Sequence, residues 1–481
     1  MNVIEADVLV VGGGSGGFGA AYRAAQHQPG IKVIVIDTMN MLGGTSTAGG
    51  VNNWEPGIGG LGVHYDLYER LSQQENAIGV AETVHFYKKE EPYGFSKIDP
   101  NCPYEQSLRR SATPRLDWRR VHFEPQMMAD MMETMLKELD VDIRYRTRFT
   151  QVHVDGHKIK SVVVQPLDGG DPYEIRSKLY VDASGGVHLC LAAECGTAFG
   201  EEGHEAYDEP SAPETPSPIV NGISQIYRVT PTDAPHIDEL PEEALAPDVQ
   251  DWLANNNPAT AITEYPNGDL CMNVLPTMQG NEFHSRSYEE SRKIAIARMF
   301  AEWHRMQTQY GFDNYRFHSM LPMVGIRESH RLVGRYVLKE QDVRAGLLHQ
   351  PKKETTIAFS DHAMDTHGER NVKGPKLGEL EQPYGVPYEC LLPKEYDNLI
   401  TATRGSSFSH IGASSCRLSR TMMAMGEAAG VASAIAIRDG MNYPDVPVDE
   451  IRETLRIPEF IEKVIREWHL EETDDTTEQA E

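Results

Sequence analysis

The sequence lacks the closely spaced cysteine pairs that mark redox centres and structural metal sites. Its six cysteines are scattered over 481 residues, and no two of them form a C-x-x-C pair. We therefore expect neither a thioredoxin-like centre nor a zinc ribbon, and we predict a reducing, cytoplasmic environment. No H-E-x-x-H or EF-hand pattern occurs, so we also predict that the protein binds no metal.

Long apolar runs and clustered basic residues are scarce as well. No stretch of about 18 apolar residues is present, and no basic segment followed by an apolar one opens the chain, so we expect neither a membrane span nor a secretory signal. The formal net charge is −27. Nucleic acid is therefore not an expected partner, because phosphate binding requires clustered Lys and Arg.

Glycine, by contrast, is concentrated near the start of the chain. The apolar run ADVLVV (residues 6–11) predicts a strand buried on both faces. Gly12, Gly14 and Gly17 follow in the spacing G-x-G-x-x-G. The first permits a tight turn, the second lets the backbone approach a pyrophosphate, and the third lets a helix pack on the strand. The positive end of that helix would bind the phosphates.

A second strand completes the pattern of a dinucleotide site. KVIVID (residues 32–37) ends in Asp37, 20 residues after Gly17, and such an acid can accept hydrogen bonds from ribose hydroxyls. The alternative is an ordinary glycine-rich turn between a strand and a helix. The motif alone does not distinguish NAD from FAD.

Later segments favour the larger cofactor. MLGGTSTAGGVNNW (residues 41–54) is a second glycine-rich loop, which would let the backbone reach a flavin with its ribityl chain. Three further segments place small residues at the end of a strand or along a helix: LYVDASGG (179–186), YDNLITATRGSS (396–407) and RTMMAMGEAAGVASAIAI (420–437).

With these segments the chain resembles the bacterial FAD-dependent oxidoreductase family of the glutathione-reductase-type flavin fold, sometimes called xanthan lyase. The resemblance spans about residues 5–455 and includes GIRESHRLVGRYVLKEQDV (325–343) and VPYECLLPKEYDNLITATR (386–404). Thr403–Arg404 stands where the family usually has Gly-Arg, and Ser184 stands where it usually has Thr. The resemblance implies an α/β, Rossmann-like FAD-binding domain with an inserted α+β substrate domain.

FAD is therefore the expected cofactor. We expect it to be non-covalent, because GGTSTAGG (residues 43–50) has no His or Cys beside the flavin loop. The adenine would lie near Phe149, and backbone N–H groups near Gly412–Ser415 would face the flavin pyrimidine. The full set of expected cofactor residues is Gly12, Gly14, Ser15, Gly16, Gly17, Asp37, Gly43, Gly44, Thr45, Ser46, Phe149, Ala183, Ser184, Gly185, Arg404, Gly412 and Ser415.

The domain boundaries are expected at proline-rich breaks. EPSAPETPSPIVNG (residues 209–222) contains four prolines and predicts a linker or loop. The expected division is FAD-binding domain 1–215, substrate domain 216–384, returning FAD-binding portion 385–445, and C-terminal helices with an acidic tail 446–481. Sequence alone shows only the break, and the inserted domain is implied by the resemblance. We expect the two C-terminal helices to be separated at Pro458.

Catalysis by a flavoenzyme needs a base near the flavin, and histidine is the usual choice. His410 and His367 are the first candidates, and His330 is a further one. The alternative for each is a surface or structural histidine. Arg327 could bind a carboxylate or orient a sugar hydroxyl, or it could pair with Glu328 on a helix surface.

The predicted function is FAD-dependent oxidation of a small polar organic molecule by hydride transfer to flavin N5. A sugar, a hydroxy acid or an amino acid is a candidate substrate. Two alternatives stay open: a flavin-binding protein without net redox, such as an isomerase or a structural protein, and an NAD(P)-dependent dehydrogenase. The sequence leaves open the electron acceptor, the substrate's identity and whether the chain forms a homo-oligomer.

Overall fold

The structure is a computed structural model of the whole chain. It describes residues 2–82, 96–111, 113–114, 117–256, 258–368 and 377–470. The predicted acidic tail, residues 471–481, lies outside these ranges.

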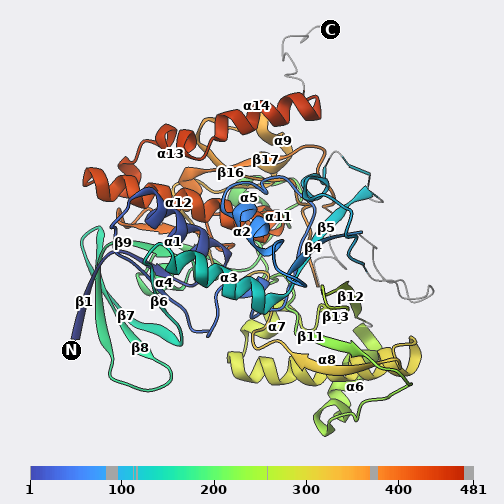
Figure 1. Cartoon of the computed structure of the whole chain (residues 1–481). Helices are drawn as coiled ribbons and strands as arrows, with labels where there is room; N and C mark the ends of the chain where they lie inside the picture. Colours follow the sequence, from blue (N-terminus) through green and yellow to red (C-terminus); the bar gives the residue numbers. More distant parts are fainter. Residues whose placement is uncertain are drawn as a thin grey trace.

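Within the described ranges, one mixed sheet of seven strands organises the fold (Figure 1). Five strands are parallel, in the order β6-β2-β1-β9-β18, and β8 and β7 continue from β9 in antiparallel fashion. Both strands predicted around the glycine motif are present. The seven strands are β1 (Asn2–Val11), β2 (Val33–Ile36), β6 (Asp142–Arg144), β7 (Thr147–Asp155), β8 (Lys158–Pro166), β9 (Tyr173–Asp182) and β18 (Leu399–Thr401).

The central strand β1 is buried on both faces, as its continuous apolar run predicts. Val8 and Val10 belong to a core shared with α1 (Ser15–His27), α3 (Pro125–Lys137) and α12 (Ser419–Asp439). Leu9 and Val11 point to the opposite core, which includes β8 and α4 (His188–Ala192).

Helices α1 and α12 touch backbone to backbone. A β-carbon on Gly19 would come within 2.5 Å of the Met423 carbonyl oxygen, and one on Gly430 would overlap the carbonyl of Ala20. The small residues predicted along both helices therefore serve close packing. This contact holds the start of α12 at the same edge of the sheet as the start of α1.

A second, antiparallel sheet has the order β12-β13-β11-β14. Its core joins Tyr227 and Met272 to Trp303 of the long helix α8. In Figure 1 this sheet and α8 lie at the end of the molecule opposite α13 and α14. The elements are β11 (Ile226–Pro231), α6 (Pro247–Asn256), β12 (Ala259–Glu264), β13 (Leu270–Leu275), α7 (Gly280–His284), α8 (Tyr288–Gln309) and β14 (Tyr315–Met320).

The segment after this sheet returns to the main core before the predicted boundary at 384. Leu338, Val343 and Tyr384 are buried in the same core as α1 and α12. The part of the expected 216–384 unit that has its own core thus ends before residue 338. The returning elements are β15 (Arg331–Leu332), α9 (Glu340–His349), β16 (Thr356–Ser360) and β17 (Tyr384–Pro387).

The predicted pair of C-terminal helices is present, but the position of the break is wrong. Helix α13 (Val448–Thr454) ends before Leu455, and α14 (Ile457–Trp468) begins after Arg456, whose φ is +55°. Pro458 lies in the first turn of α14, where a missing N–H is harmless.

The smaller elements surround the two sheets. None of the described helices has both the length and the hydrophobicity needed to cross a bilayer. The remaining elements are β3 (Asn53–Trp54), α2 (Val63–Leu71), β4 (Ile78–Glu82), β5 (Arg119–Phe123), β10 (Thr197–Ala198), α5 (His204–Tyr207) and α11 (His410–Ser415).

Candidate functional site

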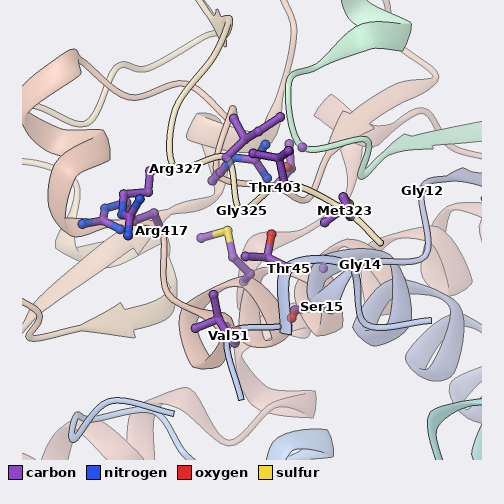
Figure 2. Close-up of a pocket in the computed structure, with 18 of the residues that line it drawn as sticks. Gly12, Gly14, Ser15, Thr45, Val51, Met323, Gly325, Arg327, Thr403 and Arg417 are labelled. Carbon is purple, nitrogen blue, oxygen red and sulfur yellow. The ribbon is translucent and has the colours of Figure 1, made fainter. Parts of the chain in front are cut away.

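A cavity of about 1330 Å³ runs along the carboxyl edge of the parallel strands. Its wall is formed by the ends of β1, β2, β9 and β18, by β12 and β13, and by the start of α12. Figure 2 shows Gly12 and Gly14 on one side of this space and Arg327 and Arg417 on the other. The cavity therefore has a glycine end and a guanidinium end.

The glycine end has the backbone geometry that the motif predicts. Gly12 has a φ of +100°, and a β-carbon there would lie 2.5 Å from the Ala183 carbonyl oxygen. Gly14 has open space where a β-carbon would be. Gly14, Ser15 and Gly16 all line the cavity. No side chain caps the first turn of α1, so the positive end of the helix is available to an anion.

Gly17 has a different position from the other loop glycines. It does not line the cavity, and a β-carbon there would overlap the carbonyl of Gly12. Close helix–strand packing, the role that the motif gives to its last glycine, accounts for this residue.

Asp37 lines the cavity at the end of β2 and also holds the glycine turn. Its Oδ2 accepts the Gly13 N–H at 2.6 Å, and its Oδ1 accepts the Met39 N–H at 2.7 Å. Burial raises the pKa of Asp37, while these hydrogen bonds oppose the rise. Each oxygen keeps a lone pair for a hydroxyl group. Phe149 of β7 lines the same end of the cavity, as predicted.

The second glycine-rich loop lies beside the first. Gly43 donates its N–H to the Gly13 carbonyl at 2.8 Å, and the Ser46 hydroxyl is 2.7 Å from that of Ser419. Gly44 and Thr45 line the cavity, whereas Gly43 and Ser46 do not. The latter two position the loop against the first turn and against α12.

The ends of β9 and β18 complete this side of the cavity. Ala183, Ser184 and Gly185 line it, and the Ser184 hydroxyl donates to Asp182 at 2.6 Å. The Arg404 Nε is buried without a hydrogen-bond partner. Burial, with a further effect of nearby Arg417, lowers the pKa of Arg404 to about 10, so the guanidinium is charged at neutral pH.

At the guanidinium end, a carboxylate links a histidine to an arginine. Asp365 Oδ2 is 2.8 Å from His367 Nε2 and 3.3 Å from Arg417 Nη2. Burial opposes ionisation of Asp365, but its interactions with His367 and Arg417 dominate and hold the pKa of this carboxyl well below its usual range. Burial lowers the pKa of His367, although Asp365 counteracts the effect. His367 therefore carries a free lone pair at neutral pH.

His410, the other leading candidate base, lies outside the cavity lining. It is buried, with Nδ1 2.9 Å from Glu328 Oε1 and Nε2 3.6 Å from Glu201 Oε1. Arg331 also pairs with Glu328. His410 is thus enclosed in a network of buried charges. His330 does not line the cavity either, and its ring lies 5.0 Å from that of Phe199.

The proposed helix-surface pair of Arg327 and Glu328 is wrong. Both residues lie on a non-helical segment between β14 and β15. Glu328 is buried and pairs with Arg331 and His410, whereas Arg327 lines the cavity. Adjacent residues of an extended chain point to opposite sides, so the two charges face different surroundings.

The helix start that faces the cavity is that of α12 rather than α11. Leu418 and Ser419 line the cavity, but Gly412 and Ser415 do not. Gly412 donates its N–H to the Ser409 hydroxyl at 2.9 Å, and the Ser415 hydroxyl donates to the His362 carbonyl at 2.6 Å. The positive end of a helix is present as expected, one helix later in the chain.

Several cavity-lining polar atoms are buried and have no hydrogen-bond partner among the residues that the structure describes. Such groups are costly unless a ligand or water satisfies them. Together with the glycine cradle and Asp37, they fit a long polar cofactor with a diphosphate such as FAD. These side chains are Trp54, Arg120, Asn273, Arg292, Ser329, His362, Arg404 and Arg420.

The fold and the cavity define a dinucleotide-binding α/β protein whose cavity extends from the nucleotide cradle to a group of charged side chains. A family model described as "FAD dependent oxidoreductase" matches residues 7–455. The chain belongs to this family and is an FAD-dependent oxidoreductase, as the sequence resemblance predicts.

More distant similarities are also found. Uncharacterized protein R188 of Acanthamoeba polyphaga mimivirus is 24% identical over 177 residues, which cover 29% of this chain and 35% of that protein. The chain therefore matches about a third of the length of this relative.

Two solved structures are also similar to this chain. A geranylgeranyl bacteriochlorophyll reductase-like protein from Thermoplasma acidophilum has 12% identity and a TM-score of 0.46, with 97% of this chain and 87% of that chain covered. The p-nitrophenol 4-monooxygenase of Pseudomonas putida has 11% identity and a TM-score of 0.43, with coverages of 98% and 88%.

The sequence analysis did not single out Arg417, Arg420 or Arg120, which line the cavity. Arg417 and Arg420 flank the first residue of α12. A basic pair at the start of the small-residue helix was a usable indication. Arg120 lies on a short strand, and nothing local to it points to a cavity.

Proposed function

We propose that this protein oxidises a small polar organic molecule, which loses a hydride from carbon and a proton from oxygen or nitrogen. When bound, the flavin accepts the hydride at N5. The chain must then bind the substrate, exclude water and take up the proton.

His367 is the proposed base. Asp365 accepts the Nε2–H of its ring at 2.8 Å, which leaves the lone pair on Nδ1. The lowered pKa of His367 keeps the ring neutral at pH 7, and the carboxylate stabilises the imidazolium formed when a proton is taken up. The observation that carries the proposal is this His–Asp pair in the lining of a cavity that also contains the dinucleotide cradle.

The test is anaerobic reduction of the bound flavin by organic donors, which is measured as the loss of flavin absorbance at about 450 nm. With a donor that reduces the wild type, His367→Gln is expected to slow reduction by about 100- to 10,000-fold with FAD content unchanged. His318→Gln is the matched control, because His318 is an exposed residue of β14, and this variant should reduce its flavin at the wild-type rate.

His410→Gln separates the two candidate histidines. Because His410 contacts buried Glu328 and not the cavity, this variant should be less stable but reduce its flavin at the wild-type rate per bound FAD. A rate lost in His410→Gln and kept in His367→Gln would reverse the assignment. Failure of every organic donor to reduce the wild-type flavin would refute the oxidase or dehydrogenase function.

The flavin is proposed to be non-covalent. Cys271 lines the cavity near the second glycine loop, where its thiol donates to the Gly50 carbonyl at 3.4 Å. Burial raises the pKa of Cys271 to about 11, and a neutral thiol is a poor nucleophile. Acid precipitation should therefore release the yellow colour into the supernatant, whereas a coloured pellet would show a covalent bond.

We also propose that the two sheets correspond to two domains. The five parallel strands with the β7–β9 meander would be a flavin domain of the glutathione-reductase type. The β11–β14 sheet would be a substrate domain inserted between β9 and β18, and its strands β12 and β13 supply one wall of the cavity.

A further inference from the structure

Arg327 has an unusual charge environment. Its Nη1 donates to the Gly222 carbonyl at 2.8 Å and to the Ser224 hydroxyl at 3.1 Å. Among the residues that the structure describes, no carboxylate lies within ion-pair distance of Arg327. Its remaining N–H groups are therefore available to the cavity that it lines.

Neighbouring charges on this side of the cavity are already matched. Asp365 is shared by His367 and Arg417. Glu55 pairs with Arg120 at 2.9 Å. Each of these carboxylates has another ion-pair partner; Asp365 favours the charged form of Arg327 through space but forms no ion pair with it.

Asp361 and the two Nη groups of Arg420, which also line the cavity, are hydrogen-bonded to uncharged groups. Asp361 accepts the backbone N–H groups of Ile58 and Arg110 at 2.9 and 3.0 Å. The Arg420 Nη1 donates to the Gly57 carbonyl at 2.6 Å, and its Nη2 also has a hydrogen-bond partner. Both Nη groups of Arg420 are thus used, unlike those of Arg327.

Arg404, another cavity arginine without an ion pair among the residues that the structure describes, lies on the dinucleotide side. A β-carbon on Gly185 would be 2.7 Å from Arg404 Nη1. This guanidinium and the start of α1 are cationic groups beside the glycine cradle, where a diphosphate belongs. Figure 2 shows Arg327 and Arg417 across the cavity from Gly12 and Gly14. No carboxylate of the described residues forms an ion pair with Arg327, so this end of the cavity can accept an anion from another molecule.

We infer that the substrate of this site carries a carboxylate, which the free N–H groups of Arg327 bind while Arg417 stabilises it from beside. The substrate class is a carboxylic acid with an oxidisable hydroxyl or amino group, rather than a neutral sugar. A planar guanidinium matches a carboxylate through two parallel hydrogen bonds. An uncompensated charge away from water is costly, and an anionic ligand removes this cost.

This inference rests on the proposed function for the identity of the ligand as substrate, but binding is measured separately. The FAD-loaded wild type is titrated by calorimetry with three acids and their uncharged amides: acetate and acetamide, glycolate and glycolamide, malonate and malonamide. At least one acid should bind 10-fold or more tightly than its amide. Equal or weaker binding of all three acids would overturn the inference.

Two substitutions locate the binding group. Arg327→Gln should weaken binding of the preferred acid by about 10- to 100-fold, because hydrogen bonds to a charged group are lost, and Arg327→Lys should restore part of it. Arg316→Gln makes the same charge change at an exposed residue of β14. This variant should bind the preferred acid as tightly as the wild type does. Unchanged affinity in Arg327→Gln would overturn the assignment, and the wild-type comparison of acids with amides decides the case if that variant does not fold.

The two proposals can fail separately. Acids that bind through Arg327 but do not reduce the flavin would leave the carboxylate site standing and refute the oxidation. If neutral alcohols reduced the flavin and neither assay showed a preference for acids, the oxidation would stand and the carboxylate site would be refuted.

Discussion

Glu328 offers the sharpest test of how this structure holds its charges. The side chain is buried, receives the Asn221 backbone N–H at 2.9 Å, and pairs with Arg331 and His410. Replacement of Glu328 by Gln keeps the shape and one acceptor oxygen, puts a donor NH2 in place of the other oxygen, and removes the negative charge. Arg331 would keep one carboxylate partner, Glu202, at 2.5 Å, and its hydrogen bonds to the Gly200 and Phe408 carbonyls.

The expected loss of stability can be worked from the pKa. Burial alone would raise the pKa of Glu328, but His410 and Arg331 outweigh it and lower the pKa from 4.5 to about 2. That difference corresponds to about 3 kcal/mol at neutral pH, the lower end of the cost of breaking a buried ion pair. Since the entropy of unfolding scales with chain length, we expect the thermal midpoint to fall by about 3 °C.

The pH dependence has a definite sign. A carboxyl whose pKa is lowered by folding stabilises the native state above its unfolded pKa, and this stabilisation is lost as the pH falls toward the folded pKa. The contribution of Glu328 should thus be complete above about pH 5.5 and decline between that pH and about 2. Thermal midpoints of wild type and Glu328→Gln should therefore converge as the pH is lowered from 7 to 3.5.

The assay is calorimetric or circular-dichroism melting of both proteins across this pH range, at matched FAD occupancy. Glu354→Gln is the control, because Glu354 is exposed and a surface change of this kind should stay within about 0.5 kcal/mol. A Glu328→Gln protein as stable as the wild type at pH 7, or a difference that does not shrink in acid, would refute the buried network.

Two further predictions concern the cavity. Gly14→Ala should change the stability of the apoprotein by no more than about 0.5 kcal/mol, because the added β-carbon enters open cavity space, but it should weaken FAD binding there. Gly16→Ala should destabilise the apoprotein by about 1–3 kcal/mol, because its β-carbon would overlap the Ala402 carbonyl. Melting of the apoproteins and FAD titration measure both, and equal stabilities for the two variants would contradict the packing described. The rate of flavin reduction should fall in acid as His367 is protonated, and Asp365→Asn should move this fall to lower pH, because Asp365 raises the pKa of His367. A pH–rate profile that Asp365→Asn leaves in place, or moves upward, would contradict the pairing.

The nucleotide cradle could be predicted from the sequence because its determinants are local. Gly12 needs a positive φ, Gly17 must let the helix approach the strand, and Asp37 ends the neighbouring strand at the same sheet edge. Each requirement follows from backbone geometry within a few residues or between adjacent parallel strands. The family resemblance extended this to FAD, and the family match over residues 7–455 agrees.

Only the tertiary structure decided which charged side chains face the cavity. His410 and His367 have equally suggestive local sequences, yet one is enclosed with Glu328 and the other lines the chamber. Arg327 and Arg417, 90 positions apart in the sequence, line the same side of the cavity, where hydrogen bonds to Gly222 and to Asp365 position them. Long-range packing sets the direction of a side chain relative to a distant wall, and no local spacing of residues encodes it.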